Sequence, residues 1–600
     1  MIPQRLTALR ALMEREGVQA YMIPSTDPHH SEYLPDCWKR RQWISGFTGS
    51  AGDVVVGTET AGLWTDGRYF LQAADQLMGS GITLMKMGQP DTPSIEKWVG
   101  DQLSPGEKFG IDPKLVSVDS AKKMAKELEE KGIEIKYIES NLIDEIWLDR
   151  PSPSNSMIEV LDTAFTGESA ADKLDRIRGA LAGKNCSYHI LGALDTIAWT
   201  LNLRGKDIDY NPLFISYAFI TPDEAHLFVN TCKVSSEMKE ALGERVIIHS
   251  YDVFGSFLSG IGSADPQPPE SKIWIDPATT NQWIMLKLGE HVTVHQERSP
   301  VVDLKSVKND TELQGMRDAH VQDGIAMVRF LKWLGETVPK GTVTENSAAD
   351  ALEKFRTQGE HFVGLSFNTI AGFADHGAII HYDPAQATGE TFLKPDGIFL
   401  VDSGGQYRNG TTDITRTITL GNPTSDQREM FTRVLMGHIN LSRTRFPSIY
   451  TGRQIEFPAR KSLWDAGKNY NHGTGHGVGH YLNVHEGPMS ISPRDTGIPL
   501  KPGNILSNEP GYYKEGEYGI RIENLVAVIE DEELSSEGMQ MLGFDTITMC
   551  PIDLELVESS IMTDGEKEWL NSYHRCVFDI LSPHLDEEHR AWLEDRTRAI

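Results

Sequence analysis

Acidic residues at the ends of apolar strands, all in the last third of the chain, restrict its fold more than any other feature. Asp402 ends an apolar run at residues 399–401, where a carboxylate is costly unless it is paired or bound to a metal. Asp413 lies on the strand that follows. Glu509 closes a second apolar strand, and Glu523 lies on the strand after it. We therefore expect two strand pairs to bring their carboxylates together around a pair of divalent cations, which would neutralise their mutual repulsion.

The first of these strand pairs carries a turn signal that conflicts with this expectation. Asn409-Gly410 is a favoured two-residue hairpin turn, and it would place Gln406, not Asp402, opposite Asp413. The two aspartates can converge only if residues 403–405 form a bulge or a loop. The two glycines in that segment are compatible with a bulge, so the sequence predicts a distorted hairpin.

A segment rich in glycine and histidine offers the nitrogen ligand. Its four histidines lie between small residues that allow close backbone approach: His472, His476, His480 and His485. Alone, such a segment is as typical of a flexible turn as of a site. A phosphate-binding loop is disfavoured because the Gly-Lys-Ser/Thr end of the P-loop is missing. Together with the four acids, His476 completes a hard, oxygen-rich donor set that favours Mn²⁺, Mg²⁺ or Co²⁺ without excluding Zn²⁺ or Fe²⁺.

This donor set predicts metal-assisted hydrolysis. Two ions about 3.5–4 Å apart would lower the pKa of a shared water, which could then attack a carbonyl group. Each acid taken alone is more often structural, as a cap or an ion pair, so the prediction depends on the joint pattern. No zinc-protease, serine-hydrolase or cysteine-nucleophile motif competes with it.

The chain is long enough for several domains, and two breaks divide it. Its 600 residues correspond to three to five average domains. A Pro/Ser cluster at residues 150–156 reads as a linker. Near residues 301–310 a strand-like pattern changes to a helix start, where Asn309 and Glu312 have capping-box spacing. These breaks predict domains at residues 1–155, 156–304 and 305–600.

The first two domains have the pattern of a duplication. Residues 5–27 align without a gap with residues 173–195, and both read as an amphipathic helix, a short turn and an apolar strand. Each copy then has a strand pair, at residues 53–69 and 214–230. Alternating helices and strands indicate α/β layers in both copies. The last domain groups its strands around tight turns between helices, which indicates an α+β domain.

Composition restricts the environment and the partners. Fifty-seven basic and 86 acidic residues give a net charge of −29, which argues against nucleic acid as a ligand. No apolar run is long enough to span a membrane, and the N-terminal segment does not resemble a secretory signal. The five cysteines are scattered and odd in number, as is typical of reduced thiols. We therefore expect a cytoplasmic protein that binds neither nucleic acid nor membrane.

Four motifs together resemble the pita-bread metallopeptidases, the family of methionine aminopeptidase and prolidase. They are the strings at residues 402–416, 472–479, 508–511 and 519–524. Within that family the chain is similar to the long, three-domain Xaa-Pro aminopeptidases of the eukaryotic cytosol, and the likeness covers nearly its whole length. The resemblance implies two related creatinase-like N-terminal domains followed by a pita-bread catalytic domain with a C-terminal extension. It also implies a homodimer.

The resemblance implies roles for individual residues. Asp402 would bind one Mn²⁺, Asp413 and Glu523 would bridge both ions, and His476 and Glu509 would complete the other, with Co²⁺ or Zn²⁺ as alternatives to manganese. The remaining implied residues act on the substrate or support the site: His381, His472, His485, Arg521 and Arg68. Of these, His381 and His485 would contact the peptide, and Arg68 would bind it from the N-terminal domain.

The implied activity is removal of the N-terminal residue from peptides with proline in the second position. Two alternatives remain open. A prolidase, which cleaves Xaa-Pro dipeptides, would have the same metal ligands, although the duplicated N-terminal region argues against it. A non-enzymatic pita-bread binding protein is disfavoured because such relatives have typically lost ligands, whereas all five are present here.

Overall fold

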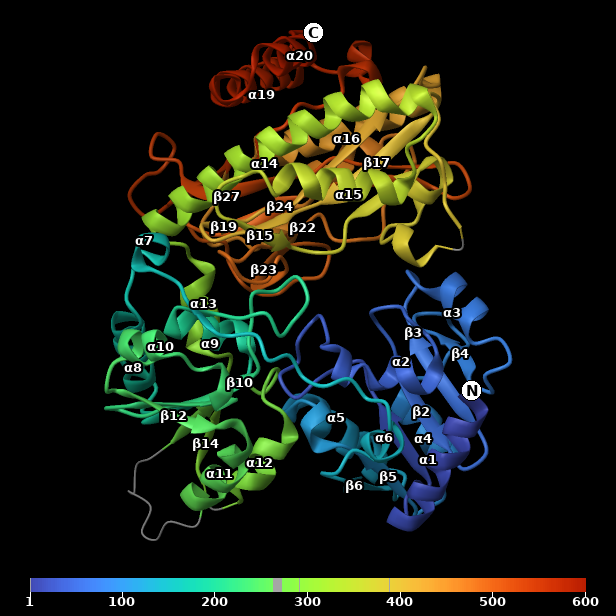
Figure 1. The fold of residues 1–600 in the computed structure, drawn as a ribbon, viewed down its shortest axis with the longest axis vertical. Helices are drawn as coiled ribbons and strands as arrows, with labels where there is room; N and C mark the ends of the chain where they lie inside the picture. The colour runs from blue at the N-terminus through green and yellow to red at the C-terminus, as the bar shows by residue number, and fades with distance from the viewer. Residues whose placement is uncertain (1, 263–271, 291, 388) are drawn as a thin grey trace. The chain divides into compact units, whose positions relative to one another are not determined.

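The computed structural model describes residues 2–262, 272–290, 292–387 and 389–600 (Figure 1). The chain divides into two compact units, each with its own sheets and core. The first unit comprises residues 1–160, 169–209 and 213–301. The second comprises residues 161–168, 210–212 and 302–600.

The first unit contains two six-stranded sheets with the same strand order. One has the order β4-β3-β2-β1-β5-β6, with strands β1 Ala20–Ile23, β2 Asp53–Gly57, β3 Ala61–Thr65, β4 Thr83–Lys86, β5 Lys108–Ile111 and β6 Glu134–Tyr137. The other has the order β12-β11-β10-β8-β13-β14, with strands β8 Tyr188–Leu191, β10 Ser216–Ile220, β11 Ala225–Val229, β12 Val246–Ser250, β13 Ile273–Ile275 and β14 Val294–Gln296. In each sheet the three strands that come first along the chain pair antiparallel with one another, and the other pairings are parallel.

Helices flank these two sheets in matching positions. They are α1 Ile2–Glu16, α2 Arg40–Ser45, α3 Phe70–Gln76, α4 Ile95–Gln102, α5 Val118–Glu129 and α6 Leu142–Ile146 in the first copy, and α8 Ala170–Gly183, α9 Leu194–Leu201, α10 Ser236–Leu242, α11 Phe254–Gly262 and α12 Gln282–Leu288 in the second. The buried positions of α1 and α8 coincide in the gapless alignment: Leu6, Leu9 and Met13 against Leu174, Ile177 and Leu181. The same apolar stripe therefore packs both helices, and the two copies are related α/β domains as predicted.

The second unit is an α+β domain in which helices cover antiparallel sheets (Figure 1). Its helices are α7 Thr163–Thr166, α13 Pro300–Ser306, whose first two residues belong to the other unit, α14 Asp310–Thr337, α15 Glu345–Arg356, α16 Ser425–Ser442, α17 Gly452–Ile455, α18 Phe457–Trp464, α19 Asp564–Leu581 and α20 Glu587–Arg596. The predicted capping box of Asn309 and Glu312 begins α14. One core joins α14, α16, α19 and a strand through Val328, Leu435, Val577 and Ile520.

The strands of this unit position the site. The largest sheet has the order β21-β28-β27-β24-β22-β23, with strands β21 Phe446–Pro447, β22 Gly475–Gly477, β23 Glu486–Ile491, β24 Ile505–Asn508, β27 Asn524–Glu530 and β28 Met541–Thr546. The others are β16-β17-β20, β15-β18-β19 and β25-β26, with strands β15 Phe362–Leu365, β16 Ile370–Phe373, β17 Ile398–Ser403, β18 Gly405–Tyr407, β19 Gly410–Thr411, β20 Ile414–Thr419, β25 Gly511–Lys514 and β26 Tyr518–Arg521.

The predicted hairpin between the two aspartates is wrong in its register. Tyr407 pairs with Gly410, so the turn residues are 408–409 rather than Asn409-Gly410. With this shift Asp402 pairs with Thr415, and the register is the same on both sides of Gly404. No bulge is needed, because residues two positions apart on one strand share a face and Asp413 becomes the diagonal neighbour of Asp402.

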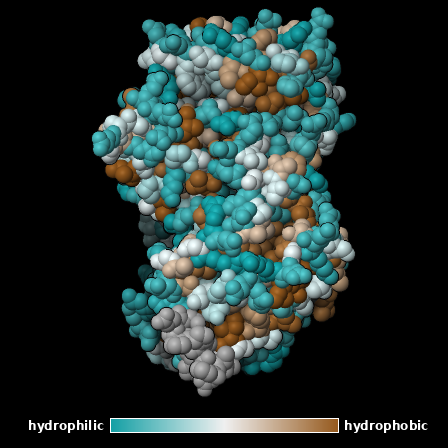
Figure 2. Space-filling model, turned by 90° about the vertical axis from the view of Figure 1, so that its left-hand side faces the viewer, coloured by the Kyte–Doolittle hydropathy of each residue, from teal (hydrophilic) through white to brown (hydrophobic). Residues whose placement is uncertain are grey.

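The described residues include no helix that is long and apolar enough to cross a membrane. Figure 2 shows one face of the molecule, on which hydrophilic residues predominate and hydrophobic residues lie in separate groups. The five cysteines are all free thiols. The second unit therefore owes its stability to packing and polar contacts, without disulfides.

Candidate metal centre

Two strand pairs of the second unit meet at the four acids. Asn508 and Asn524 form the last pair of the β24–β27 ladder, and β25 and β26 continue the same register, so Glu509 and Glu523 lie directly opposite each other. Thr415 joins this pair to the Asp402 hairpin, because its carbonyl accepts a hydrogen bond from Glu523 N at 3.1 Å. The Thr415 hydroxyl donates to Glu523 Oε2 at 2.8 Å.

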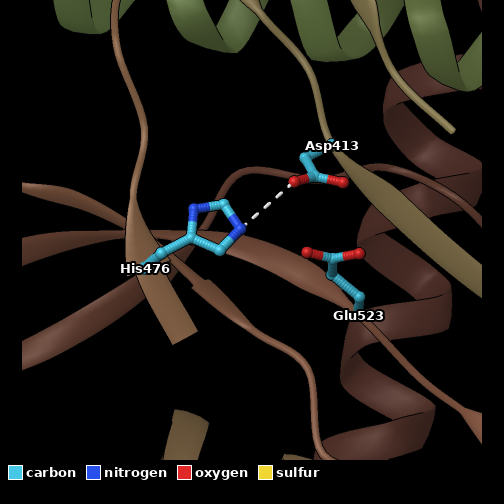
Figure 3. Close-up of side chains that lie close together, drawn as sticks. All are labelled: Asp413, His476 and Glu523. Atoms are coloured by element: carbon cyan, nitrogen blue, oxygen red, sulfur yellow. Dashed lines mark ion pairs between the residues drawn. The ribbon is translucent and has the colours of Figure 1, made fainter. Parts of the chain in front are cut away.

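His476 approaches the acids from strand β22. A register shift between His476 and Gly477 interrupts its pairing with β23 and re-aims the side chain. Its Nδ1 donates to the carbonyl of Gly477 at 3.0 Å, which turns Nε2 toward the acids as the candidate ligand atom. Nε2 lies 3.4 Å from Asp413 Oδ2 and 3.5 Å from Glu509 Oε1 (Figure 3). The glycines are required, because a Cβ at Gly475 would lie 1.9 Å from a backbone oxygen.

The residues present fit a divalent cation. One ligand atom each from Asp413, His476 and Glu523 lies within 4.8 Å of the others, and their side chains point toward one another in Figure 3. Asp402 Oδ1 is buried without a hydrogen-bond partner among the described residues, as expected of an oxygen that awaits a metal. Hard carboxylate oxygens with one imidazole suit manganese, cobalt or zinc. The structure thus brings all five predicted ligands together.

The electrostatics of the site also favour a bound cation. Burial, reinforced by the neighbouring carboxylates, raises the pKa of Asp402, of Glu509 to about 7 and of Glu523 well above its ordinary value. Burial alone would lower the pKa of His476, but Asp413 and Glu509 outweigh it and raise the value to about 9. The charges of this cluster are therefore poorly compensated by the chain itself.

Arg521 connects the acids to His472. Its Nη2 donates to Asp402 Oδ2 at 2.7 Å, and its Nη1 donates to the hydroxyl of Tyr513 at 2.7 Å. That hydroxyl lies 2.8 Å from His472 Nε2, while His472 Nδ1 donates to the carbonyl of Gly473. Burial, reinforced by the charge of Arg521, lowers the pKa of His472 to about 3, so the imidazole stays neutral and accepts from Tyr513.

The other predicted residues lie in different surroundings. The ring of His485 meets that of His476 edge to face, with centroids 4.4 Å apart. His381 is exposed and follows Ile380, whose carbonyl accepts from Arg521 at 3.4 Å. Arg68 belongs to the first unit, where it forms an ion pair of 2.7 Å with Asp66.

Sequence reasoning missed Tyr513, which joins Arg521 to His472. The signal was available: Glu509, Gly511 and Tyr513 are spaced by two, so they share a face, and Gly511 pairs with Arg521. A tyrosine on the same face as a ligand, diagonal to a buried arginine, is a candidate hydrogen-bond partner.

Comparison with known families accounts for nearly the whole chain. Two models of the creatinase/prolidase N-terminal domain match residues 5–146 and 149–312. The model of metallopeptidase family M24 matches residues 314–530, and that of the C-terminal region of the family matches residues 540–600. The predicted fold, two creatinase-like domains followed by a pita-bread catalytic domain, is confirmed.

Individual proteins match along almost their full length. The probable Xaa-Pro aminopeptidase P of Fusarium vanettenii is 43% identical over 99% of this chain and 98% of its own, and that of Laccaria bicolor is 43% identical over 98% and 92%. The crystal structure of an X-prolyl aminopeptidase from Caenorhabditis elegans, described as a cytosolic enzyme with a di-nuclear active site, superposes with a TM-score of 0.95 at 38% identity and full coverage of both chains. A prolidase from Pyrococcus horikoshii, at 20% identity and a TM-score of 0.50, covers 64% of this chain and 99% of its own, and shares the fold. The chain therefore belongs to metallopeptidase family M24 and, within it, to the Xaa-Pro aminopeptidases P.

Proposed function

We propose that this protein removes the N-terminal residue from peptides whose second residue is proline. The observation that carries the proposal is the convergence of four carboxylates and His476 in one buried site. The full-length likeness to Xaa-Pro aminopeptidases P supports the choice of substrate. The presence of all five ligand side chains disfavours the alternative of a non-enzymatic binding protein.

The five ligand residues would hold two divalent cations, for which manganese is our first choice and cobalt or zinc the alternatives. When bound, such cations supply a water of lowered pKa and polarise the scissile carbonyl. Asp413 and Glu523, which lie on the two different strand pairs, would hold both cations. Asp402 would complete one site, and His476 and Glu509 would complete the other.

The chain's own groups then handle the proton and the peptide. The leaving proline nitrogen must receive a proton, and Glu509 or Glu523 would carry it from the attacking water. Arg521 holds the Asp402 carboxylate and, through Tyr513, His472. Hydrogen bonds from His381 and His485 would orient the peptide.

Proline in the second position demands a dedicated site. The Xaa-Pro bond lacks an N–H and its proline has a fixed φ, so a pocket built for ordinary peptides fits it poorly. Flat imidazole faces such as that of His485 can line a pocket for the pyrrolidine ring.

Release of the N-terminal amino acid from three peptides tests the proposal: Xaa-Pro-Pro, Xaa-Ala-Pro and the dipeptide Xaa-Pro. Each is incubated with Mn²⁺ and, in parallel, with excess chelator. Cleavage of Xaa-Pro-Pro that is lost on chelation supports the aminopeptidase. Preference for the dipeptide would assign the protein as a prolidase instead, and cleavage of Xaa-Ala-Pro at the same rate would remove proline as the specificity element.

We also propose a cytoplasmic homodimer. The C. elegans relative is described as cytosolic, and the free thiols of this chain suit a reducing compartment. Trp569 and Trp592 are partly buried and pack against the core of the second unit, which is compatible with helix packing as well as with an interface. Light scattering that gives a monomer mass at micromolar concentration would refute the dimer.

A further inference from the structure

Two asparagines lie immediately behind the pair of glutamate ligands. Asn508 precedes Glu509, Asn524 follows Glu523, and the two asparagines face each other as the last pair of the β24–β27 ladder. Both are fully buried. Because successive side chains alternate across a sheet, these amides point away from the acids and toward the covering helices.

Helix α16 receives both amides at His438. Asn508 Nδ2 donates to the carbonyl of His438 at 2.9 Å and to the hydroxyl of Ser442 at 3.0 Å. In return, His438 Nδ1 donates to the carbonyl of Asn508 at 3.0 Å, and its Nε2 accepts from Asn524 Nδ2 at 3.2 Å. One neutral imidazole thus holds the strands of both glutamates.

Arg416 and Tyr573 close this arrangement from the other side. The guanidinium of Arg416 donates to the carbonyl of Glu523 at 2.6 Å and to Asn524 Oδ1 at 2.8 Å. It also donates to Tyr573, which lies on α19 in the C-terminal region, at 3.1 Å. The Tyr573 hydroxyl in turn donates to the carbonyl of Cys550 at 2.9 Å. We call these five residues the support cluster: Arg416, His438, Asn508, Asn524 and Tyr573.

The composition of the support cluster is costly for a purely structural core. Arg416 is 2% exposed, and its hydrogen-bond acceptors are neutral oxygens: the carbonyls of Thr415, Glu523, Cys550 and Pro551, the amide of Asn524 and the hydroxyl of Tyr573. A buried guanidinium without a carboxylate partner has a desolvation penalty that apolar residues in its place would not have. Its planar donors, however, can hold several oxygens in one geometry.

We propose that the support cluster is a positioning device that sets the spacing of Glu509 and Glu523 and thereby the affinity of the site for its second cation. The inference rests on the proposed function, because it requires a site for two cations. It also gives the C-terminal region a role: Tyr573 makes α19 part of the frame of the metal centre. Hydrogen bonds one step removed from metal ligands typically contribute 10–100-fold to metal affinity.

Mn²⁺ titration of the metal-free, full-length protein by calorimetry tests this inference. Y573F deletes one hydroxyl, and N524S shortens one amide. We expect the wild type to bind two cations, and both variants to bind the second about tenfold more weakly while the affinity for the first changes little. The electron paramagnetic resonance signal of coupled Mn²⁺ pairs should weaken in parallel, and kcat should fall more than KM rises.

A matched control separates positioning from general loss of packing. Y518F deletes a buried tyrosine hydroxyl from the same core, one that donates to Asp426 at 2.6 Å and lies outside the support cluster. Unchanged binding of the second cation in Y573F, or an equal loss in Y518F, would overturn the inference. A wild-type protein that binds fewer than two cations would instead overturn the proposed site, and this appears before any variant is made.

Discussion

The second unit buries two groups of carboxylates that differ in how their charge is balanced. Glu486 is almost fully buried and accepts hydrogen bonds from Lys305, at 2.7 Å, and from Lys308. The four acids of the candidate metal centre are less completely buried, with side-chain exposures of up to 18%, and they share two cations of the chain: Arg521 at Asp402, and His476 at Asp413 and Glu509. Burial raises the pKa in both groups, yet the two lysines lower the pKa of Glu486 below its ordinary value, while Glu509 and Glu523 stay raised.

This difference distinguishes a structural acid from a ligand. Asp323 follows the structural pattern, since it accepts from Arg356 at 2.7 and 3.1 Å and its pKa is lowered. Where cations of the chain balance the buried carboxylates, as at Glu486 and Asp323, the acids are part of the fold. Where four carboxylates share Arg521 and His476, the excess negative charge requires cations from solution.

The largest effect is expected for E523Q, which replaces the predicted bridging carboxylate by an amide of the same shape. We expect kcat/KM to fall about a thousandfold or more, because an interaction at the reacting atoms is lost. The metal-free protein should not lose stability, since a poorly compensated charge has been removed. Peptide cleavage and the metal content of the purified protein measure both effects, with E537Q at an exposed glutamate as the control. Near-wild-type turnover with two metals bound would contradict the bridging role.

E486Q should destabilise the metal-free protein, in contrast to E523Q. It leaves two buried lysines without their shared carboxylate, so we expect the second unit to lose about 3–5 kcal/mol of unfolding free energy. Differential scanning calorimetry on the metal-free protein measures the loss. A variant as stable as the wild type would show that Lys305 and Lys308 are hydrated, and the distinction drawn here would fail.

Metal addition should stabilise only where the acids are uncompensated. At Mn²⁺ concentrations 100-fold above the dissociation constant, each site contributes about 2.7 kcal/mol by mass action. The melting transition of the second unit should therefore rise with Mn²⁺ in the wild type and in E486Q, and much less in E523Q. An equal rise in E523Q would indicate that the cation binds elsewhere.

The smallest effect is a pH dependence of opposite sign in the two groups. Glu509 has its pKa raised from 4.5 to about 7, so the folded metal-free protein retains a proton that the unfolded chain releases, and stability falls as pH rises between these values. Glu486 has a lowered pKa, so its contribution is present above pH 4.5 and is lost as pH falls. Each group contributes at most about 1.4 kcal/mol per pH unit.

Melting curves of the metal-free protein from pH 4 to 8 resolve the two contributions. E509Q should reduce the loss of stability between pH 4.5 and 7, to which Asp402 and Glu523 also contribute through their raised pKa values, and E486Q should reduce the loss below pH 4.5. Saturation with Mn²⁺ should reverse the first slope, because the cation competes with the proton at Glu509. A wild-type protein whose stability rises steadily through this range would contradict the raised pKa.

Much of the fold was readable because it depends on local pattern. The apolar stripe of α1 recurs in α8, and the capping box at Asn309 marks the start of α14. Strand register was not readable, since a turn at residues 408–409 instead of 409–410 moves every cross-strand partner by two positions. That shift removed the need for the bulge that the sequence predicted.

By itself the sequence determined the donor set of this protein: four carboxylates and an imidazole, on strands whose apolar residues bury them. Only the tertiary structure decided how the charge of each buried acid is balanced. Lys305 reaches Glu486 across 181 residues, and Asn508 and Asn524 meet His438 on a helix about seventy and eighty-six residues away. Charge compensation depends on distance in space, and residue types along the chain do not record which cations fold back onto which carboxylates.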